Sequence, residues 1–370
     1  MRKANKKPTV PLVSGPIVEV LRQAAESIGA TLLIEPEWQC VGQITYLSGV
    51  RRYFRLSTLD LNTMGASEIA RDKGYSRFFL RHMNYPVPTG NTFLSPEWSK
   101  KLGAPDRGGI LNAWSYAKSI GLPVFVKPNS LSRGIGVAKA HNWTEFHRAA
   151  SEAMKCDKVI IVERAVVGQD YRLVVLDGEV ISAYERVALT IVGDGISTIT
   201  DLLTKRQEDF TRHGRETVID CNDYRLEANL RRNSLTLDSI PKAGNIIELL
   251  DIANLSAGGT SLDVTNRLHP TFRELARSIA RDMGLRLVGV DLIVHGDIDA
   301  EPTEGHYWII EINSAPGLDH YASMGDIQKR LVDDLYLRVI KAMERPHEEI
   351  YRSDAIRQGH QEPADCDKVT

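Results

Sequence analysis

The segment that decides the fold reads Trp308-Ile309-Ile310-Glu311-Ile312-Asn313-Ser314-Ala315-Pro316-Gly317. It is an apolar strand that carries a carboxylate and, two residues later, an amide. Because successive side chains of a strand point to opposite faces, Glu311 and Asn313 lie on the same face. We therefore expect this strand to present two oxygen ligands side by side.

A second apolar run carries a single acid and reads Leu287-Val288-Gly289-Val290-Asp291-Leu292-Ile293-Val294. If the two strands are neighbours, Asp291, Glu311 and Asn313 converge as hard oxygen ligands. Mg²⁺ is commonly held through one or two carboxylates together with substrate phosphates. The alternative is that both acids merely end their strands, although an unpaired acid inside an apolar run is costly to bury.

A candidate phosphate-binding loop lies upstream and reads Gly121-Leu122-Pro123-Val124-Phe125-Val126-Lys127-Pro128-Asn129-Ser130-Leu131-Ser132-Arg133-Gly134-Ile135-Gly136-Val137. An apolar strand presents Lys127, and Pro128 ends its hydrogen-bond ladder. The glycines allow backbone N–H groups to approach phosphates closely, and the lysine adds a positive charge. The segment contains neither GxxxxGK[ST] nor GxGxxG, so it is neither a P-loop nor a dinucleotide fingerprint. Alone, it also fits an ordinary glycine-containing hairpin turn.

Two further apolar strands with a short polar connection occupy residues 158–175, Lys158-Val159-Ile160-Ile161-Val162-Glu163-Arg164-Ala165-Val166-Val167-Gly168-Gln169-Asp170-Tyr171-Arg172-Leu173-Val174-Val175. A connection of this kind can offer backbone groups to the edge of an adenine ring. Asp170 can accept hydrogen bonds from ribose hydroxyls. These features favour a nucleotide site that is completed by the metal strands.

The order of these segments resembles the ATP-grasp carboxylate–amine ligases, from about Gly42 to Met343. The similarity is strongest to the ATP-grasp module of cyanophycin synthetases and of bifunctional glutathione synthetases. The strings that carry it are Ser67-Glu68-Ile69-Ala70-Arg71-Asp72-Lys73, Tyr85-Pro86-Val87-Pro88-Thr89-Gly90, Glu185-Arg186-Val187, Val192-Gly193-Asp194-Gly195, Leu235-Thr236-Leu237-Asp238-Ser239-Ile240-Pro241, Ala253-Asn254-Leu255-Ser256-Ala257-Gly258-Gly259-Thr260, Asp263-Val264-Thr265 and His269-Pro270.

The resemblance implies an α/β chain with α+β subdomains and the ATP-grasp fold. Its expected parts are an N-terminal α/β domain at 1–86, a small lobe with the phosphate loop at 87–165, a C-terminal lobe with the metal and acyl-phosphate site at 166–345, and a flexible tail at 346–370. The tail is charged and lacks apolar periodicity, which is typical of solvated segments.

Sequence patterns predict the positions of several elements. A helix is expected after Gly15, then a strand at Ala30–Glu35 and a loop to Gln43. Further helices are expected at 67–83, 109–120 and 143–155, and within the polar insertion at 201–233.

The resemblance also implies the reaction. ATP would phosphorylate a carboxylate, and an amine would displace phosphate from the acyl-phosphate to form an amide, with ADP and phosphate released. Chemically, a carboxylate repels nucleophiles, whereas a mixed anhydride with phosphate carries a good leaving group. Positive charge must cover the transferring phosphoryl group, and water must be excluded.

Residues matched to the family's motifs receive expected roles. Those for catalysis are Arg186, Asn254 and Lys127. Those for ATP are Lys73, Lys127, Arg133, Gly134 and Gly136 at the phosphates, Glu163, Arg164, Ala165 and Val166 at the adenine, and Asp170 at the ribose. Asp291, Glu311 and Asn313 would hold Mg²⁺, with two ions expected and Mn²⁺ able to substitute.

Each of these residues also has an ordinary structural interpretation. Arg172 and Arg186 fit solvated strand faces, Asn254 fits a turn before two glycines, and Lys73 fits a helix surface. For His82 and His269, a structural role is the simpler interpretation, and His320 has no partner that the sequence identifies.

Departures from the relatives limit any transfer of their substrates. Leu131 replaces a usual glycine in the phosphate loop, which predicts a stiffer lid, and Leu250 replaces a usual arginine. After Pro316-Gly317 the cyanophycin-type enzymes continue with arginine, whereas this chain continues with Leu318-Asp319-His320-Tyr321. The Mur-ligase-like half of cyanophycin synthetases and the cysteine-ligating half of bifunctional glutathione synthetases find no counterpart here. We therefore expect a ligase that joins an amino acid or small peptide to another amine.

The composition is ordinary for a soluble globular protein. The chain of 370 residues is 42% hydrophobic and 25% charged with a net charge of −2, which argues against a nucleic-acid surface. We expect no membrane span, no signal peptide, reduced cysteines, a cytoplasmic location and a homo-oligomer, either a dimer or a tetramer. Two other functions stay open: an ATP-grasp kinase that phosphorylates a small molecule, and a non-catalytic nucleotide-binding module.

Overall fold

The computed structural model describes residues 16–322 and 325–345, and the predicted tail at 346–370 lies outside this range. The chain forms two compact units. One comprises the described parts of Met1–Asn62 and Tyr336–Thr370, and the other comprises Thr63–Leu335. Within the described residues, no helix is both long and apolar enough to cross a membrane. The domain boundaries expected from the sequence remain predictions.

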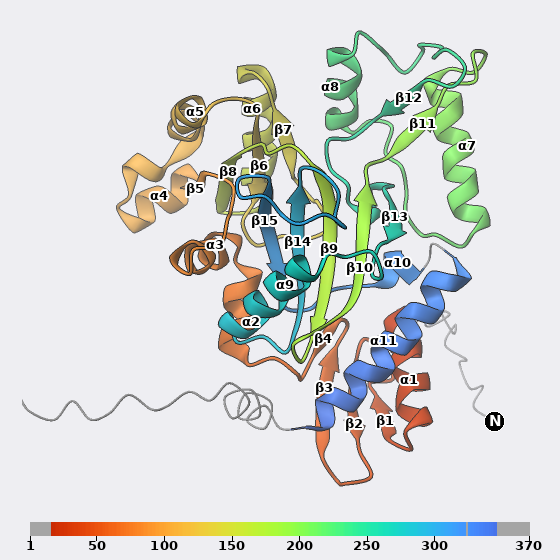
Figure 1. The fold of residues 1–370 in the computed structure, drawn as a ribbon. Coiled ribbons are helices and arrows are strands. Elements are labelled where there is room, and N and C mark those ends of the chain that lie inside the picture. The colour runs from red at the N-terminus through yellow and green to blue at the C-terminus, as the bar shows by residue number, and fades with distance from the viewer. Residues whose placement is uncertain (1–15, 323–324, 346–370) are drawn as a thin grey trace, which may run out of the picture. The chain divides into compact units, whose positions relative to one another are not determined.

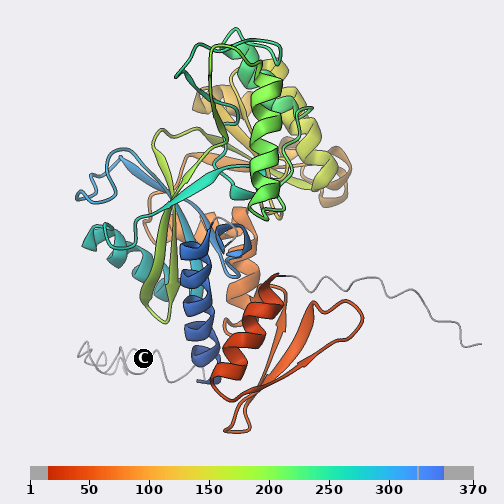
Figure 2. The ribbon, with the colours of Figure 1, turned by 90° about the vertical axis from the view of Figure 1, so that its right-hand side faces the viewer.

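The first unit is a small antiparallel sheet with helices. Its strands run in the order β1 (Thr31–Ile34), β2 (Val41–Thr45), β3 (Arg51–Arg55) and β4 (Thr58–Leu59). Helix α1 (Pro16–Ser27) precedes them, and α11 (Asp326–Glu344) ends in this unit (Figure 2). The Tyr46 hydroxyl donates to the Ile340 carbonyl at 2.6 Å, which ties the sheet to α11. The predicted helix and strand are confirmed, but the predicted loop to Gln43 is wrong because β2 begins at Val41.

A four-stranded antiparallel sheet forms the small lobe of the second unit. Its order is β5 (Gly90–Leu94), β8 (Val159–Arg164), β6 (Val124–Pro128) and β7 (Ala138–Ala140). Helices α5 (Gly109–Ile120) and α6 (Trp143–Cys156), both predicted, share a buried core with Val126 and Val162 on one sheet face. Since side chains alternate, Lys127 and Glu163 project from the opposite face. Two short helices, α4 (Pro96–Leu102) and η1 (Pro105–Arg107), follow β5.

A five-stranded sheet forms the centre of this unit (Figure 1). Its order is β13 (Thr260–Asp263), β10 (Glu179–Val187), β9 (Gln169–Leu176), β14 (Leu287–Val294) and β15 (Tyr307–Asn313). Helix α9 (Pro270–Asp282) covers one face through buried Phe272, Ala276 and Ile279, which pack with Leu173 and Val290. The prediction that the two acidic strands are neighbours is confirmed, because Asp291 stands directly opposite Glu311.

Two helices replace the single helix predicted at 67–83. They are α2 (Met64–Arg71) and α3 (Lys73–His82), with Asp72 between them in an extended conformation. The break follows from capping, because the Asp72 carboxylate accepts from the Tyr75 N–H at 2.8 Å and so begins a new helix. Lys73 is therefore the first residue of α3 and is buried, with 8% of its surface exposed.

The insertion contains the two helices that the polar pattern predicts, α7 (Ile199–Arg212) and α8 (Tyr224–Arg232). A two-stranded sheet of β11 (Thr190–Val192) and β12 (Ile246–Glu248) accompanies them. Leu203, Leu230 and Ile247 contribute to one apolar cluster that Phe125 and Val137 of the small lobe also contact. The short helices η2 (Leu255–Ala257) and α10 (Asp319–Ala322) complete the unit.

Candidate nucleotide and metal site

One face of the five-stranded sheet carries a row of charged side chains. The strand register sets Arg186 opposite Asp170, Arg172 opposite Asp291, and Asp291 opposite Glu311. Residues that pair across strands share a face, so all of these side chains lie on the side away from α9. Three of the four strands involved were identified from sequence, and the structure brings their predicted residues together.

Two arginines surround the carboxylate of Asp291, which is only 3% exposed. Arg172 binds it with two prongs, from Nε at 2.6 Å and from Nη2 at 2.7 Å. Arg186 approaches the same carboxylate at 3.1 Å. Burial alone would raise the pKa of Asp291, but the two guanidinium groups hold this pKa below its usual value. Asp291 therefore remains an anion, which is the form that binds a metal.

Asp170 is the second partner of Arg186, and its pKa shifts in the direction opposite to that of Asp291. Arg186 Nη2 lies 2.5 Å from the Asp170 carboxylate. Burial raises the pKa of Asp170 to about 6, and the negative charge of Asp291 adds to this, although Arg186 opposes it. The two carboxylates thus compete for one guanidinium, and Asp170 holds its proton more readily.

The three predicted metal ligands meet at the end of this row. With its amide oriented to satisfy its neighbours, Asn313 donates to Glu311 at 3.1 Å and accepts from Arg172 at 3.1 Å. Two carboxylates and an amide oxygen fit Mg²⁺, which keeps several waters and takes further oxygens from phosphates. Among the residues that the structure describes, no group of three or more His, Cys, Asp or Glu side chains could hold a metal. Because Asp291, Glu311 and Asn313 supply only a few oxygen donors, they suit an ion that also takes phosphate oxygens as ligands.

Lys73 links the metal strand to the phosphate loop. Its ammonium lies 3.2 Å from Glu311 and donates to the carbonyl oxygen of Leu131 at 2.5 Å. Asn129 positions this helix start, because its amide donates to Asp72 at 2.6 Å and accepts from the Gly74 N–H at 2.8 Å. The interpretation of Lys73 as an ordinary surface lysine is therefore wrong.

The small lobe presents a second charged group. Lys127 lies 2.5 Å from Glu163, and both side chains are 6% exposed. Arg77 of α3 approaches Glu163 from the other side at 3.5 Å. Burial lowers the pKa of Arg77. Sequence analysis missed Arg77, although its place one helical turn after Lys73 could have indicated it.

The loop between β6 and β7 contacts the segment around Asn254. Gly134 adopts a φ of +71°, and a Cβ there would lie 2.6 Å from Asn254 Oδ1, so only glycine fits. A Cβ at Gly136, whose φ is +68°, would lie 2.9 Å from the Pro128 ring, and Arg133 is exposed. Asn254 therefore contacts the phosphate loop. A few residues later in the chain, Ser261 pairs with Arg186 across β13 and β10. The segment 254–261 thus runs from the phosphate loop to Arg186.

The connection between β8 and β9 is anchored through its backbone. The Arg164 N–H donates to Thr89 at 2.7 Å, and the Ala165 N–H donates to Pro123 at 3.0 Å. The N–H groups of Arg164 and Ala165 in the predicted adenine hinge are thus engaged within the protein. Val166 is the hinge residue whose N–H can serve an adenine ring.

The structure shows where several residues that differ from the relatives, and the histidines, lie. Leu250 is 4% exposed and packs in the apolar cluster of the insertion. Tyr321 stacks on Tyr184, with ring centroids 4.6 Å apart, and donates to Asp263 at 3.1 Å. The structural interpretations of two histidines are confirmed, because His82 stacks on Phe78 and His269 caps α9. The side chain of His320 lies outside the described residues.

Charges across the site nearly balance. The cations are Lys73, Arg77, Lys127, Arg172 and Arg186, and the carboxylates are those of Glu163, Asp170, Asp291 and Glu311. Each anion has a cationic partner and the cations exceed the anions by one. A polyphosphate can therefore enter by exchanging partners, and its own charge replaces that of the carboxylates at the lysines and arginines.

Comparisons with known proteins agree with this fold. Residues 108–211 match the family model described as D-ala D-ala ligase C-terminus, and residues 231–337 match that of the inositol 1,3,4-trisphosphate 5/6-kinase ATP-grasp domain. The cyanophycin synthetase of Trichormus variabilis is 32% identical over 312 residues, which are 82% of this chain and 32% of that protein. The chain belongs to the ATP-grasp family.

Proteins of glutathione synthesis are also similar to this ATP-grasp chain. The glutathione biosynthesis bifunctional protein of Streptococcus agalactiae is 33% identical over 230 residues, which are 60% of this chain and 29% of that protein. The crystal structure of a bifunctional glutathione synthetase from Pasteurella multocida has a TM-score of 0.52 at 22% identity, covering 86% of this chain and 44% of that one. This likeness shows the fold. The chain spans about a third of the length of the curated relatives it matches.

The raised pKa of Asp170 predicts a pH-dependent contribution to stability. Its folded-state pKa of about 6 exceeds the usual value of 3.8, so the folded protein holds an extra proton between these values. Stability from this group is therefore full below about pH 4 and is lost as the pH rises through about 6. The melting temperature of wild type minus that of Asp170→Asn should increase as the pH falls from about 7 to about 5. A difference that stays constant over this range would contradict the assignment.

Proposed function

We propose that this ATP-grasp chain is an ATP-dependent carboxylate–amine ligase that forms an amide through an acyl-phosphate. The observation that carries the proposal is the opposed pair Asp291 and Glu311, flanked by Arg172 and Arg186 on one sheet and reached by Lys73. Oxygen ligands for a metal and cations for a transferring phosphoryl group are thus held together on one buried face.

ATP would lie between the two sheets of the second unit. The adenine would meet the hinge at Val166, and the ribose hydroxyls would donate to Asp170. Lys127, Lys73 and the backbone of the loop at Gly134 would contact the phosphates. Support comes from the burial of both lysines, which are 5% and 8% exposed and are therefore directed inward rather than into solvent.

Asp291, Glu311 and Asn313 would hold Mg²⁺, with two ions proposed and Mn²⁺ as a substitute. When bound, the metal would neutralise charge that develops on the phosphate oxygens. Arg172 already orients Asp291 and Asn313, because it donates to both. The guanidinium of Arg172 therefore fixes the positions of two of the three proposed metal ligands.

The residues of the chain would then serve two successive steps. In the first, an oxygen of the acid substrate attacks the γ-phosphorus, the bond to the β-phosphate oxygen breaks, and ADP leaves. In the second, the amine attacks the acyl carbon, a tetrahedral centre forms and collapses, and phosphate leaves while the amine nitrogen loses a proton. Arg186 would contact the transferring phosphoryl group, and Asn254 would lie at the loop that covers it.

The substrates are proposed as amino acids or short peptides. Support comes from the relatives, whose names describe the synthesis of cyanophycin and of glutathione. The substrate pockets of this chain are proposed to differ from those of the relatives, since Leu318 follows Pro316-Gly317 where an arginine is expected. Tyr321, in the same segment, packs on Tyr184. A cytoplasmic location is also proposed, consistent with Cys40, Cys156 and Cys221 being free thiols.

A second candidate function is phosphorylation of a hydroxyl group. The observation that favours it is the match of residues 231–337 to a kinase ATP-grasp domain. The same cations and metal ligands would serve this reaction, because phosphoryl transfer depends on positioning and charge rather than on the acceptor. The identity of the acceptor therefore separates the two.

Product analysis tests the reaction. With an amino-acid acid and an amine, the enzyme should release ADP and phosphate, and hydroxylamine in place of the amine should yield a hydroxamate of the acid. Screening a matrix of amino acids by ADP release, with mass detection of products, would find the substrates. ADP formation that needs a hydroxyl acceptor and no amine would establish the kinase instead, and stoichiometric AMP would contradict both.

The metal assignment is tested by Glu311→Gln. This change keeps the side-chain shape but removes a charge from the donor set, so kcat should fall by at least about 100-fold, since metal stabilisation contributes several kcal/mol. The matched control is Glu304→Gln, at an exposed position shortly before β15, which should leave kcat unchanged. Circular dichroism confirms folding of both variants. Near-normal turnover of Glu311→Gln at ordinary Mg²⁺ would rule out the assignment.

A further inference from the structure

The loop at residues 129–137 has weak internal bonding. Within it, the Ile135 N–H donates to the Ser132 carbonyl at 3.2 Å and the Val137 N–H donates to the Gly134 carbonyl at 3.3 Å, at the long end of the range for such bonds. Two glycines with positive φ add conformational freedom that must be lost when the loop orders. The order of this loop must therefore depend on contacts from outside it.

Lys73 and Asp157 contact the first part of the loop, at Leu131 and Ser130, and Arg225 of α8 contacts its glycine-containing part. Nη1 of Arg225 donates to the carbonyl oxygens of Gly134 and Val137, each at 3.0 Å. The other guanidinium nitrogens bind Asp223, from Nη2 at 2.6 Å and from Nε at 3.0 Å. Burial opposes the charge, but Asp223 raises the pKa of Arg225 above its usual value. One guanidinium thus joins the loop at two points to the start of α8.

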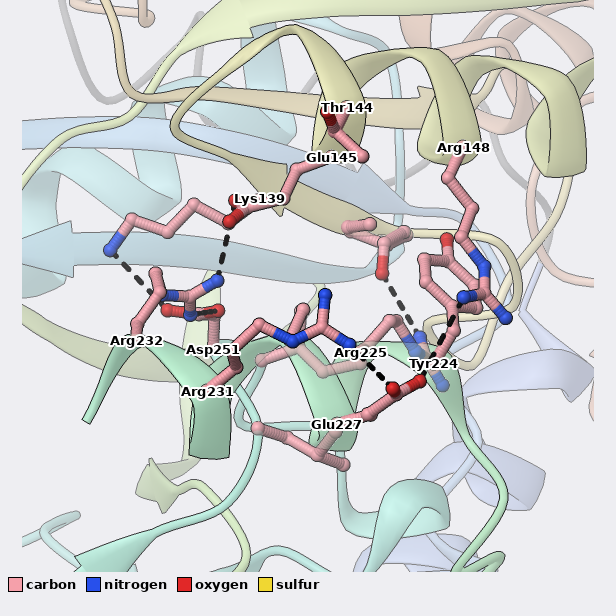
Figure 3. A pocket seen from close by; sticks show the side chains of 15 residues that line it. Lys139, Thr144, Glu145, Arg148, Tyr224, Arg225, Glu227, Arg231, Arg232 and Asp251 are labelled. Carbon is pink, nitrogen blue, oxygen red and sulfur yellow. Dashed lines mark hydrogen bonds and ion pairs between the residues drawn. The ribbon is translucent and has the colours of Figure 1, made fainter. Parts of the chain in front are cut away.

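Helix α8 is in turn fixed to the small lobe. Figure 3 shows the pocket between α6 and α8, where charged side chains pair across the gap. Arg232 lies 3.4 Å from Glu145 of α6 and 2.5 Å from Asp251, and Asp251 lies 3.5 Å from Lys139 of β7. Glu145 and Lys139 belong to the same lobe as the loop. Arg225 therefore holds the loop against a helix, α8, that is itself bonded to that lobe through Arg232.

A second contact comes from the segment that carries Asn254. Ser256 Oγ donates to the carbonyl oxygen of Arg133 at 2.9 Å. Arg215, which is 6% exposed, holds this segment through the carbonyl oxygens of Leu255 and Gly259, the latter at 2.7 Å. The loop is therefore contacted from two directions, by Arg225 of the insertion and by Ser256, whose segment is held by the buried Arg215 of the insertion.

We propose that the insertion is a brace for the phosphate loop, and that Arg225 is a positioning residue that orders the loop before ATP binds. The inference rests on the proposed function, since it assigns the loop to ATP phosphates. A loop ordered in advance costs less entropy on binding, so loss of the brace should weaken ATP binding more than it slows the chemical step. Arg225 itself reaches the backbone, and the loop N–H groups reach the phosphates.

Arg133 allows a direct measurement of loop order, because it is exposed in the loop and trypsin cleaves after arginine. In Arg225→Ala, cleavage at Arg133 should be at least about tenfold faster than in wild type, since a charge-assisted pair of hydrogen bonds is lost. The KM for ATP should rise by at least about tenfold with a smaller change in kcat. Arg225→Lys should restore the wild type only in part, because one ammonium cannot reproduce both prongs of the contact.

Arg231→Ala is the matched control, because Arg231 lies on the same helix, is 72% exposed and pairs with Glu227. It should behave as wild type in both assays. Ser256→Ala, a milder change, should also speed cleavage at Arg133, and it keeps the test decisive if Arg225→Ala does not fold. Equal cleavage at Arg133 in Arg225→Lys, Ser256→Ala and wild type would overturn the brace.

The failure of the brace is distinguishable from the failure of the proposed function. Saturating MgATP should slow cleavage at Arg133 in wild type and in the Arg225 variants. One outcome is that MgATP slows cleavage of the wild-type loop while the variants, without nucleotide, are cleaved at the wild-type rate. In that case the brace is wrong, and the assignment of the loop to ATP is kept. If MgATP leaves wild-type cleavage unchanged, the loop does not bind the nucleotide and both proposals fall.

Discussion

The buried carboxylate of Asp291 is the constraint on which the site depends. A carboxylate that is 3% exposed in the middle of an apolar strand is stable only when its charge is compensated. Arg172 and Arg186 provide this compensation from two adjacent strands. Removing one partner of a buried pair costs roughly 3–5 kcal/mol, so the three strands must keep their register. The register then fixes Asp170 and Glu311 as well.

This arrangement also explains how a strongly charged site can be stable without its ligand. Arg186 divides its donors between Asp170 and Asp291, and Lys73 and Lys127 rest on Glu311 and Glu163. Each of these pairs contains one group proposed to bind phosphate or metal. Binding of MgATP would thus exchange internal partners for external ones, with little change in the number of compensated charges. The brace on the phosphate loop serves the same end for the backbone.

Much of the site was predictable because strands encode their faces in single residues. Alternation placed Glu311 and Asn313 on one face, and Asp291 was expected beside them if the two strands were neighbours, which the register shows them to be. Other features required the tertiary structure. Asp72 interrupts the predicted helix by capping, and this decides where Lys73 points. Arg225 acts through the backbone carbonyls of the loop, and such contacts leave no periodic signal in the sequence.

The direct test of the account is a structure of the protein with Mg²⁺ and a non-hydrolysable ATP analogue. The account predicts that the Asp291 and Glu311 carboxylates coordinate the metal, and that Arg186 has moved from Asp291 to the γ-phosphate oxygens. Lys127 should have left Glu163 for a phosphate. A bound nucleotide whose phosphates lie away from these residues, with Arg172 and Arg186 still paired to Asp291, would contradict the central claim.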